Sequence, residues 1–259
     1  MKQNLTSTSK ITWCPGCPDA QILVAFRQAV TELTTENKLK LENLVAVAGI
    51  GCHGKIAEYM AINTFTSLHG RALPSMTGIK AANPLLTVVG FLGDGDSFSE
   101  GMDHLVHAAR RNSNITAFIH DNQIFALTTG QATPTSPKGF KGKSTPEGSL
   151  EDPLEPLPLM LDLGATFVAR SFALDIKRTK EIMKAAISHK GFAFVDIIQP
   201  CITFFDTRKY FEERVTWTDS APATSVEGAR AKIQAGNVGD KVPCGIFYQV
   251  SKPTFEEQI

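Results

Sequence analysis

Residues 85 to 101 read LLTVVGFLGDGDSFSEG, an apolar run followed by two glycines that flank an aspartate. The run from 85 to 93 has the length and composition of a strand that is buried on both faces. Gly93 and Gly95 permit a tight turn, and a predicted helix opens at Ser99. The stretch therefore predicts a strand, a turn and a helix, the unit from which parallel sheets are built.

Other parts of the chain repeat this unit. The other predicted strands lie at 43–49, 115–122, 165–171 and 191–199, and the other predicted helices begin at Pro18 and run from Thr179 to His189. Because strands and helices alternate with short connections, the sequence predicts an α/β fold with a mostly parallel sheet and helices on both faces.

Two stretches depart from this alternation. Residues 128–158 are rich in proline, glycine, serine and lysine, and a loop of that length inside a domain is usually functional or disordered. The tail from about Tyr210 to Ile259 is predicted to be irregular. We therefore predict one domain over residues 1–209 and a C-terminal extension over residues 210–259, packed on the domain or on a partner chain.

Composition excludes some classes of function. The chain has 259 residues, of which 26 are Lys or Arg and 26 are Asp or Glu. This charge balance gives no reason to expect a nucleic-acid partner or an anionic membrane surface. The N-terminus lacks an apolar signal core, and no apolar run reaches about 18 residues, so we expect a cytoplasmic protein without a membrane partner.

The glycine turn carries a candidate metal and phosphate site. Asp94 is a hard carboxylate suited to Mg²⁺, and the start of a helix favours phosphate, although a lone G-D-G is also consistent with a turn and capping aspartates. Asn122 ends the next predicted strand, so its side chain can reach the same edge of the sheet as Asp94. With the carbonyl of Ile124 they could hold Mg²⁺ and a diphosphate. The pair resembles the thiamine-diphosphate motif.

Several further motifs occur in a characteristic order. They are WCPGC (13–17), GIGCHGK (49–55), LHGRALPSMTGIKAANP (68–84), GDGD (93–96), NQIFALTTGQATPT (122–135) and VPCGIFYQVSKPTFEE (242–257). In this order they resemble the β subunit of the 2-oxoacid:ferredoxin oxidoreductases, over roughly residues 11 to 205 and in the tail. HLVHAARRN (104–112) favours the 2-oxoglutarate branch over the pyruvate branch.

The resemblance implies a thiamine-diphosphate-binding fold and a redox function. The expected reaction is the oxidative decarboxylation of 2-oxoglutarate to succinyl-CoA and CO₂, with electrons passing through a [4Fe–4S] cluster to ferredoxin. Residues 1–209 would then bind thiamine diphosphate, Mg²⁺ and the cluster. The alternatives are pyruvate or broad 2-oxoacid specificity, a non-redox thiamine-dependent decarboxylase subunit with a structural zinc, and a non-catalytic assembly subunit.

The resemblance also implies partners. An α subunit, or a fused γα subunit, would supply the pyrimidine-binding half of the cofactor site, including the Glu that activates the aminopyrimidine. The 2-oxoacid and coenzyme A would be the substrates, and ferredoxin would accept the electrons.

The chain has five cysteines. Their uneven spacing argues against a disulfide framework, and four thiolates suit either zinc or an iron–sulfur cluster. The resemblance assigns the cluster to Cys14, Cys17, Cys52 and Cys201, and a thiamine site that generates electrons needs an acceptor, which zinc is not. Cys244 lies in an apolar stretch and is predicted to be a packed hydrophobic residue.

The remaining site residues follow from the resemblance. The residues expected to bind the cofactor are Cys52, His53, Gly93, Asp94, Gly95, Asp96, Asn122, Ile124, Leu127 and Thr128. Lys55 is expected near the substrate carboxylate, and His69 near the thiamine ring. From the residues alone, Lys55 could equally be an exposed lysine and His69 a hydrogen-bonded core residue. Leu127 would line the substrate pocket, and Thr129 stands where some relatives carry Lys.

Overall fold

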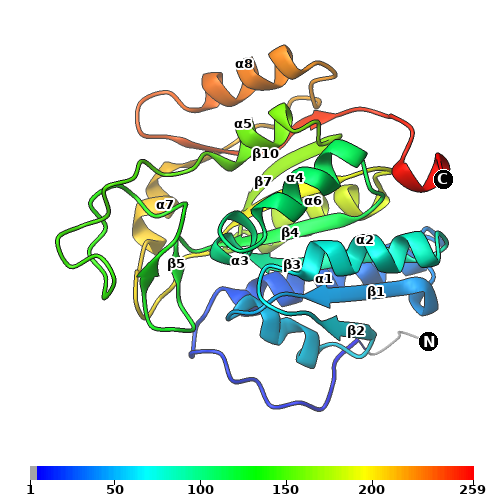
Figure 1. Cartoon of the computed structure of the whole chain (residues 1–259), viewed down its shortest axis with the longest axis horizontal. Coiled ribbons are helices and arrows are strands. Elements are labelled where there is room, and N and C mark those ends of the chain that lie inside the picture. The colour runs from blue at the N-terminus through cyan, green and yellow to red at the C-terminus, as the bar shows by residue number, and fades with distance from the viewer. Residues whose placement is uncertain (1–4) are drawn as a thin grey trace.

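The strand predicted at 85–93 lies inside an eight-stranded sheet whose strand order is β2-β1-β3-β4-β8-β7-β10-β9 (Figure 1). The computed structural model describes residues 5–259. The strands of this sheet are β1 (Leu44–Ala48), β2 (Asn63–Thr66), β3 (Thr87–Gly93), β4 (Thr116–Asp121), β7 (Phe167–Phe172), β8 (Ala193–Ile198), β9 (Val215–Trp217) and β10 (Val242–Gln249). A separate two-stranded sheet consists of β5 (Ile124–Phe125) and β6 (Gln131–Ala132).

The large sheet is mostly parallel, which confirms the predicted fold class. β10 runs antiparallel to β7, and the remaining pairs in the sheet are parallel. The α-helices are α1 (Asp19–Thr35), α2 (Ala72–Ala82), α3 (Asp94–Phe98), α4 (Met102–Arg111), α5 (Pro156–Asp162), α6 (Ile176–Ser188), α7 (Arg208–Arg214) and α8 (Val226–Gly236). Short 3₁₀ helices are η1 (Leu41–Asn43), η2 (His53–Tyr59) and η3 (Phe255–Glu257).

Helices cover both faces of the sheet. On one face α1 packs beside α6, and residues such as Phe26 of α1 contact Phe91 and Phe118 of the central strands. On the other face α2, α4, α5 and α8 cover apolar residues such as Ile119 and Phe194. Since β4 and β8 are buried along their whole length, apolar residues such as Phe118 and Ile119 follow one another in them instead of alternating with polar ones.

The glycine turn differs from the prediction in one respect. The chain becomes helical at Asp94 and forms the short helix α3, so Ser99 lies between α3 and α4 instead of opening the helix. Gly93 is extended and precedes the first turn, which places Asp94 and Asp96 at the amino end of α3. Carboxylates are favourable there, because the first backbone N–H groups of a helix are unpaired.

The prediction of an irregular tail is wrong. Residues 210–259 contain α8 and the strands β9 and β10, and β10 lies inside the sheet between β7 and β9. Cys244 of β10 is fully buried against Phe172, Ile198 and Phe211, as predicted for a packed residue. The domain division at residue 209 stays a prediction, and helix α7 crosses it.

Residues 5–259 contain no helix that is both long enough and apolar enough to cross a membrane.

Candidate functional site

A cavity opens at the carboxyl ends of β1, β3 and β4, where ligands bind in open parallel sheets. Its walls are formed by Ile50, Gly51, Cys52, His53, His69, Gly93, Asp94, Gly95, Asp96, Asn122, Ile124, Phe125, Ala126, Leu127 and Thr128. The structure therefore brings together the residues predicted to bind the cofactor, together with His69. Lys55 does not line the cavity; its Nζ lies 3.4 Å from the carbonyl oxygen of Thr12.

Asp94 is held at the cavity by two hydroxyl groups. Thr133 Oγ1 and Thr135 Oγ1 donate to Asp94 Oδ2 at 2.6 and 2.9 Å. Burial raises the pKa of Asp94 to about 6, although both hydrogen bonds favour the ionised form. A divalent cation would relieve the electrostatic cost of keeping this carboxylate ionised out of water. The residue therefore fits the role of a Mg²⁺ ligand.

Asn122 and Ile124 complete an oxygen donor set. Asn122 Nδ2 donates to Gln199 Oε1 at 3.1 Å, and Asn122 Oδ1 accepts from the backbone N–H of Ile124 at 3.1 Å. These bonds fix the orientation of the amide. Gly95 lies so close to Phe125 that a Cβ atom would come within 2.3 Å of that ring. A carboxylate, an amide oxygen and a carbonyl beside a glycine turn suit Mg²⁺ and a diphosphate.

The carboxylate of Asp96 faces the protein. Its Oδ1 accepts from the backbone N–H of Gly70 at 2.7 Å and lies 3.0 Å from His69 Nδ1. Its Oδ2 lies 3.6 Å from His53 Nε2. Burial opposes ionisation, but the nearby His53 and the backbone N–H of Gly70 lower the pKa of Asp96 overall. Asp96 therefore orients two histidines that line the cavity.

A buried pair that sequence reasoning missed lies behind these histidines. His120 Nδ1 is 2.7 Å from Asp19 Oδ1, and both residues are fully buried. Burial lowers the pKa of His120, although Asp19 opposes this shift. The His120 ring lies 5.9 Å from that of His53, and Asp19 Oδ2 accepts from Cys17 Sγ at 3.6 Å. The pair thus connects the cavity to the C-x-x-C turn; the position of Asp19 two residues after Cys17 was the only sequence signal for it.

Three chain segments bring the predicted cluster cysteines near one another. Trp13 Nε1 donates to the carbonyl of Cys52 at 2.7 Å, and Gln199 Nε2 lies 3.8 Å from Cys17 Sγ. Cys52 packs against buried Cys201. All five cysteines are free thiols.

The thiols share an electrostatic environment. Burial, followed by the charge of Asp19, raises the pKa of Cys52 to about 11. The same two causes raise the pKa of Cys17 above its usual range. Cys201 and Cys14 also raise the pKa of Cys52. Within residues 5–259, no three His, Cys, Asp or Glu side chains converge as ligands of a single metal ion. A [4Fe–4S] cluster instead takes four thiolates at separate irons. Four free thiols from three adjoining segments fit such a group, and iron coordination would offset the raised pKa values.

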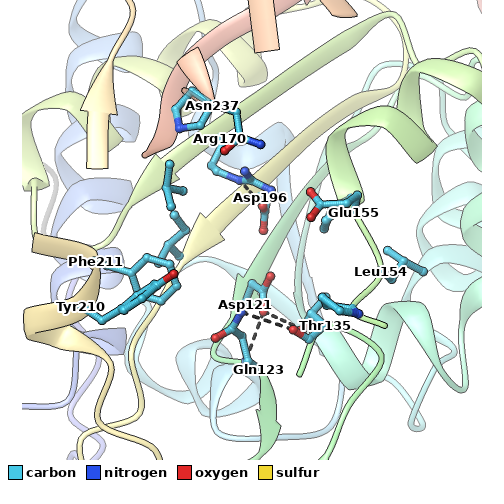
Figure 2. A pocket seen from close by; sticks show the side chains of 15 residues that line it. Asp121, Gln123, Thr135, Leu154, Glu155, Arg170, Asp196, Tyr210, Phe211 and Asn237 are labelled. Atoms are coloured by element: carbon cyan, nitrogen blue, oxygen red, sulfur yellow. Dashed lines mark hydrogen bonds and ion pairs between the residues drawn. The ribbon is translucent and has the colours of Figure 1, made fainter. Parts of the chain in front are cut away.

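A second polar cavity adjoins the first and was not predicted (Figure 2). Thr135 Oγ1 lies 2.9 Å from both Asp94 Oδ2 and Asp121 Oδ1. A hydroxyl group has one proton, so it cannot donate to both carboxyl groups at once. Burial, followed by the charges of Asp196 and Asp94, raises the pKa of Asp121 well above its usual range. These surroundings disfavour the charged form of Asp121, which shares the Thr135 hydroxyl with Asp94.

A buried ion pair lies in the same cavity. Arg170 Nε donates to Asp196 Oδ2 at 2.6 Å, and Figure 2 shows both side chains above Asp121. Burial opposes the charge of Arg170, but Asp196 raises its pKa overall. Asp121 is a polar residue at the end of β4, and this was the signal that could have included it in the predicted site.

The comparisons with known proteins agree with this geometry. Residues 49–197 match the family model "Thiamine pyrophosphate enzyme, C-terminal TPP binding domain", and residues 201–259 match the model of the C-terminal part of the pyruvate ferredoxin oxidoreductase beta subunit. The chain is 42% identical to the 2-oxoacid:ferredoxin oxidoreductase subunit beta of Sulfolobus sp., over 95% of this chain and 85% of that protein. It is 39% identical to the 2-oxoglutarate synthase subunit KorB of Archaeoglobus fulgidus, over 74% of this chain and 70% of that protein.

A solved structure is also similar. It is the 2-oxoglutarate:ferredoxin oxidoreductase from Magnetococcus marinus, with 2-oxoglutarate, coenzyme A and succinyl-CoA bound. The TM-score is 0.92 at 36% sequence identity, and the match covers 98% of this chain and 86% of that chain.

Proposed function

The chain belongs to the β subunits of the 2-oxoacid:ferredoxin oxidoreductases, and we propose that the assembled enzyme converts 2-oxoglutarate, with coenzyme A, to succinyl-CoA and CO₂. The observation that carries this proposal is the cavity in which Asp94, Asn122 and Ile124 meet beside the glycine turn. The names of the Archaeoglobus and Magnetococcus relatives include 2-oxoglutarate, which supports this substrate over pyruvate.

The residues of the cavity divide into two roles. Asp94, Asn122 and the carbonyl of Ile124 would hold Mg²⁺, and the glycine turn would let the backbone approach the diphosphate. Thiamine diphosphate, when bound, supplies the carbon nucleophile and the electron sink for decarboxylation. Thr133 and Thr135 keep Asp94 oriented and ionised.

The substrate side of the cavity has a histidine and an apolar wall. Because His69 Nδ1 faces Asp96, its Nε2 is the ring nitrogen left to form a hydrogen bond with the substrate. Leu127 is half-exposed and would contact the carbon chain of the 2-oxoacid. Lys55 would have to leave the carbonyl of Thr12 before it could reach a substrate carboxylate.

Electrons would leave through the cysteines. Cys52 lines the cavity and also packs against Cys201, so a [4Fe–4S] cluster on Cys14, Cys17, Cys52 and Cys201 would adjoin the cofactor. Ferredoxin would accept the electrons from this cluster. An α or γα subunit would cover the mouth of the cavity, where Ile50, Leu68 and Leu127 are 38%, 77% and 47% exposed.

The test uses the complex of this chain with its co-expressed partner, purified without oxygen. Reduction of a low-potential dye is measured with coenzyme A and pyruvate, 2-oxobutyrate or 2-oxoglutarate. We expect the highest kcat/KM with 2-oxoglutarate, and we expect Asp94→Ala and Asn122→Ala to abolish turnover with each substrate. A preference for pyruvate would contradict the substrate assignment, and full activity of both variants would contradict the thiamine role.

A further inference from the structure

The proline-rich loop, residues 128–158, folds back onto the cofactor cavity. Phe140 of this loop packs with Ile124, Ala126 and Cys201, in the cluster between the two cofactor sites. The backbone N–H of Gly139 donates to the carbonyl of Ser149 at 2.8 Å, and that of Ser149 donates to the carbonyl of Phe140 at 2.9 Å. The loop is therefore anchored by an aromatic ring and closed by its own hydrogen bonds.

The tip of the loop touches the turn that forms the rim of the cavity. A Cβ atom at Gly142 would lie 2.5 Å from the carbonyl oxygen of Gly130, so the two segments approach as closely as glycine allows. Lys143 Nζ donates to Thr129 Oγ1 at 2.6 Å. The residues just before Thr129, Leu127 and Thr128, line the cavity.

The backbone at Thr129 is strained. Its φ is 77°, in the left-handed region that β-branched residues rarely adopt. Such strain persists where the surrounding structure requires it, often at ligand sites. The same residue accepts the hydrogen bond from Lys143.

The positive charge of Lys143 has no carboxylate partner among residues 5–259, since its one hydrogen bond there is to a neutral hydroxyl. Lys138 of the same loop differs, because its Nζ pairs with Asp152 at 3.0 Å. The residues that line the cavity include no Lys or Arg in the described part of the chain. Lys143 is thus a permanent cation at the rim of a cavity whose own walls lack one.

We propose that Lys143 binds the distal carboxylate of a dicarboxylic 2-oxoacid and so determines substrate specificity. The inference rests on the proposed function and goes beyond it by naming the residue that distinguishes dicarboxylic from monocarboxylic substrates. A hydrogen bond between ammonium and carboxylate is stronger than one to a hydroxyl, so the substrate would displace Thr129 from Lys143. A monocarboxylic 2-oxoacid has no group for this contact and gains nothing from it.

The test compares two substrates in the holo-complex carrying Lys143→Met. At saturating coenzyme A, we expect the KM for 2-oxoglutarate to rise at least about 10-fold, with kcat and the KM for 2-oxobutyrate changed less than about twofold. Lys143→Arg should retain most of the preference. Lys138→Met, on the same loop but paired with Asp152, is the matched control and should leave the substrate ratio unchanged.

Three results would overturn the inference. An unchanged substrate ratio in Lys143→Met would mean that Lys143 does not bind the distal carboxylate. An equal loss of kcat/KM with 2-oxoglutarate and 2-oxobutyrate, seen in Lys143→Arg as well as in Lys143→Met, would assign Lys143 a role in loop structure only. A raised KM for coenzyme A with an unchanged KM for 2-oxoglutarate would assign its ammonium group to the phosphates of coenzyme A. A wild-type complex that is inactive on every 2-oxoacid would instead contradict the proposed function itself.

Discussion

The two ends of the parallel strands are built in opposite ways. At the carboxyl end lie the cavity and the cysteines, and buried polar atoms lack hydrogen bonds within residues 5–259, among them His53 Nε2, Asp96 Oδ2 and His120 Nε2. At the amino end, Asn112 uses the full hydrogen-bonding capacity of its side chain. The carboxyl end therefore has unpaired polar groups around a cavity, whereas at the amino end Asn112 is fully bonded within the chain, although Ser113 Oγ and Glu256 Oε1 there have no partner among the described residues.

Asn112 shows how the amino end is closed. Its Nδ2 donates to the carbonyls of Lys252 and Pro253 at 3.3 and 3.0 Å, and its Oδ1 accepts from Thr166 Oγ1 at 2.7 Å and Phe192 N at 2.8 Å. The residue ends α4 in a left-handed conformation with φ 51°, as asparagine tolerates. A single side chain thus joins α4, β7, β8 and the C-terminal segment. The groups for chemistry and this stabilising asparagine thus lie at opposite ends of the same strands.

The largest effect on function is expected at the carboxyl end, in Cys17→Ser. Loss of a cluster ligand should remove most of the iron and sulfide from the variant complex, and its dye reduction should fall to near background. Because Cys17 does not line the cavity, thiamine diphosphate should still bind. Iron and sulfide analysis after anaerobic purification measures this. Cys244→Ala, in the core beside Phe172, is the control and should keep its iron.

Two outcomes would contradict this assignment of the carboxyl end. Stoichiometric zinc without iron in the wild-type protein would contradict the cluster and favour a structural metal. Unfolding of the metal-free Cys17→Ser chain would mean that the carboxyl end also carries the stability of the fold.

The largest effect on stability is expected at the amino end, in Asn112→Ala. The change removes four hydrogen bonds and places alanine at a positive φ, so the free energy of unfolding should fall by about 2–4 kcal/mol. Urea unfolding measures it. Asn37→Ala is a matched control, since Asn37 is exposed with φ 55° and should cost about 1 kcal/mol or less. A lowered kcat in the folded Asn112→Ala complex would contradict the separation of the two ends.

A smaller, pH-dependent effect on the free energy of unfolding is expected from His189 at the amino end. Its Nε2 lies 2.8 Å from Thr166 Oγ1, and burial lowers its pKa from 6.5 to about 4. Because the unfolded chain takes up the proton first, stability is lost as the pH falls from about 6.5 to about 4. Since His189 is partly exposed, we expect this loss to be about 1–2 kcal/mol.

The measurement is the free energy of unfolding of wild type and His189→Gln at pH 7 and pH 4. The variant should lose less stability than the wild type over this interval, because glutamine does not titrate. Equal losses in the two proteins would show that the histidine stays unprotonated in both states or protonates in both.

The sequence predicted the elements that carry their own local signal. Runs such as ITAFIHDN have an apolar centre and a polar end, so β4 and the position of Asn122 after it could be recognised without knowing the neighbours. The convergence of Asp94 and Asn122 followed from the topology, because the carboxyl ends of adjacent parallel strands meet at one edge. The order of motifs then supplied the family.

The features that the sequence did not predict depend on contacts between distant segments. Nothing near Asp94 indicates that Thr133 and Thr135 would bond to it, and the contact of Lys143 with Thr129 depends on how the loop closes. β10 was missed because VPCGIFYQ contains Pro and Gly, which weaken the signal of a strand, and its stability comes from pairing with β7. In each case the tertiary partner, and not the local residues, decides the structure.

The position of β10 constrains the order of synthesis and assembly. It is the last strand within residues 5–259, yet it pairs with β7 inside the sheet. Synthesis must therefore have passed Gln249 before the sheet can be completed. Cys14 and Cys201 are separated by most of the sequence and meet only after the strands between them have folded. Iron insertion would accordingly follow folding, and a chain shortened before β10 would expose the edge of β7 during its lifetime in the cell.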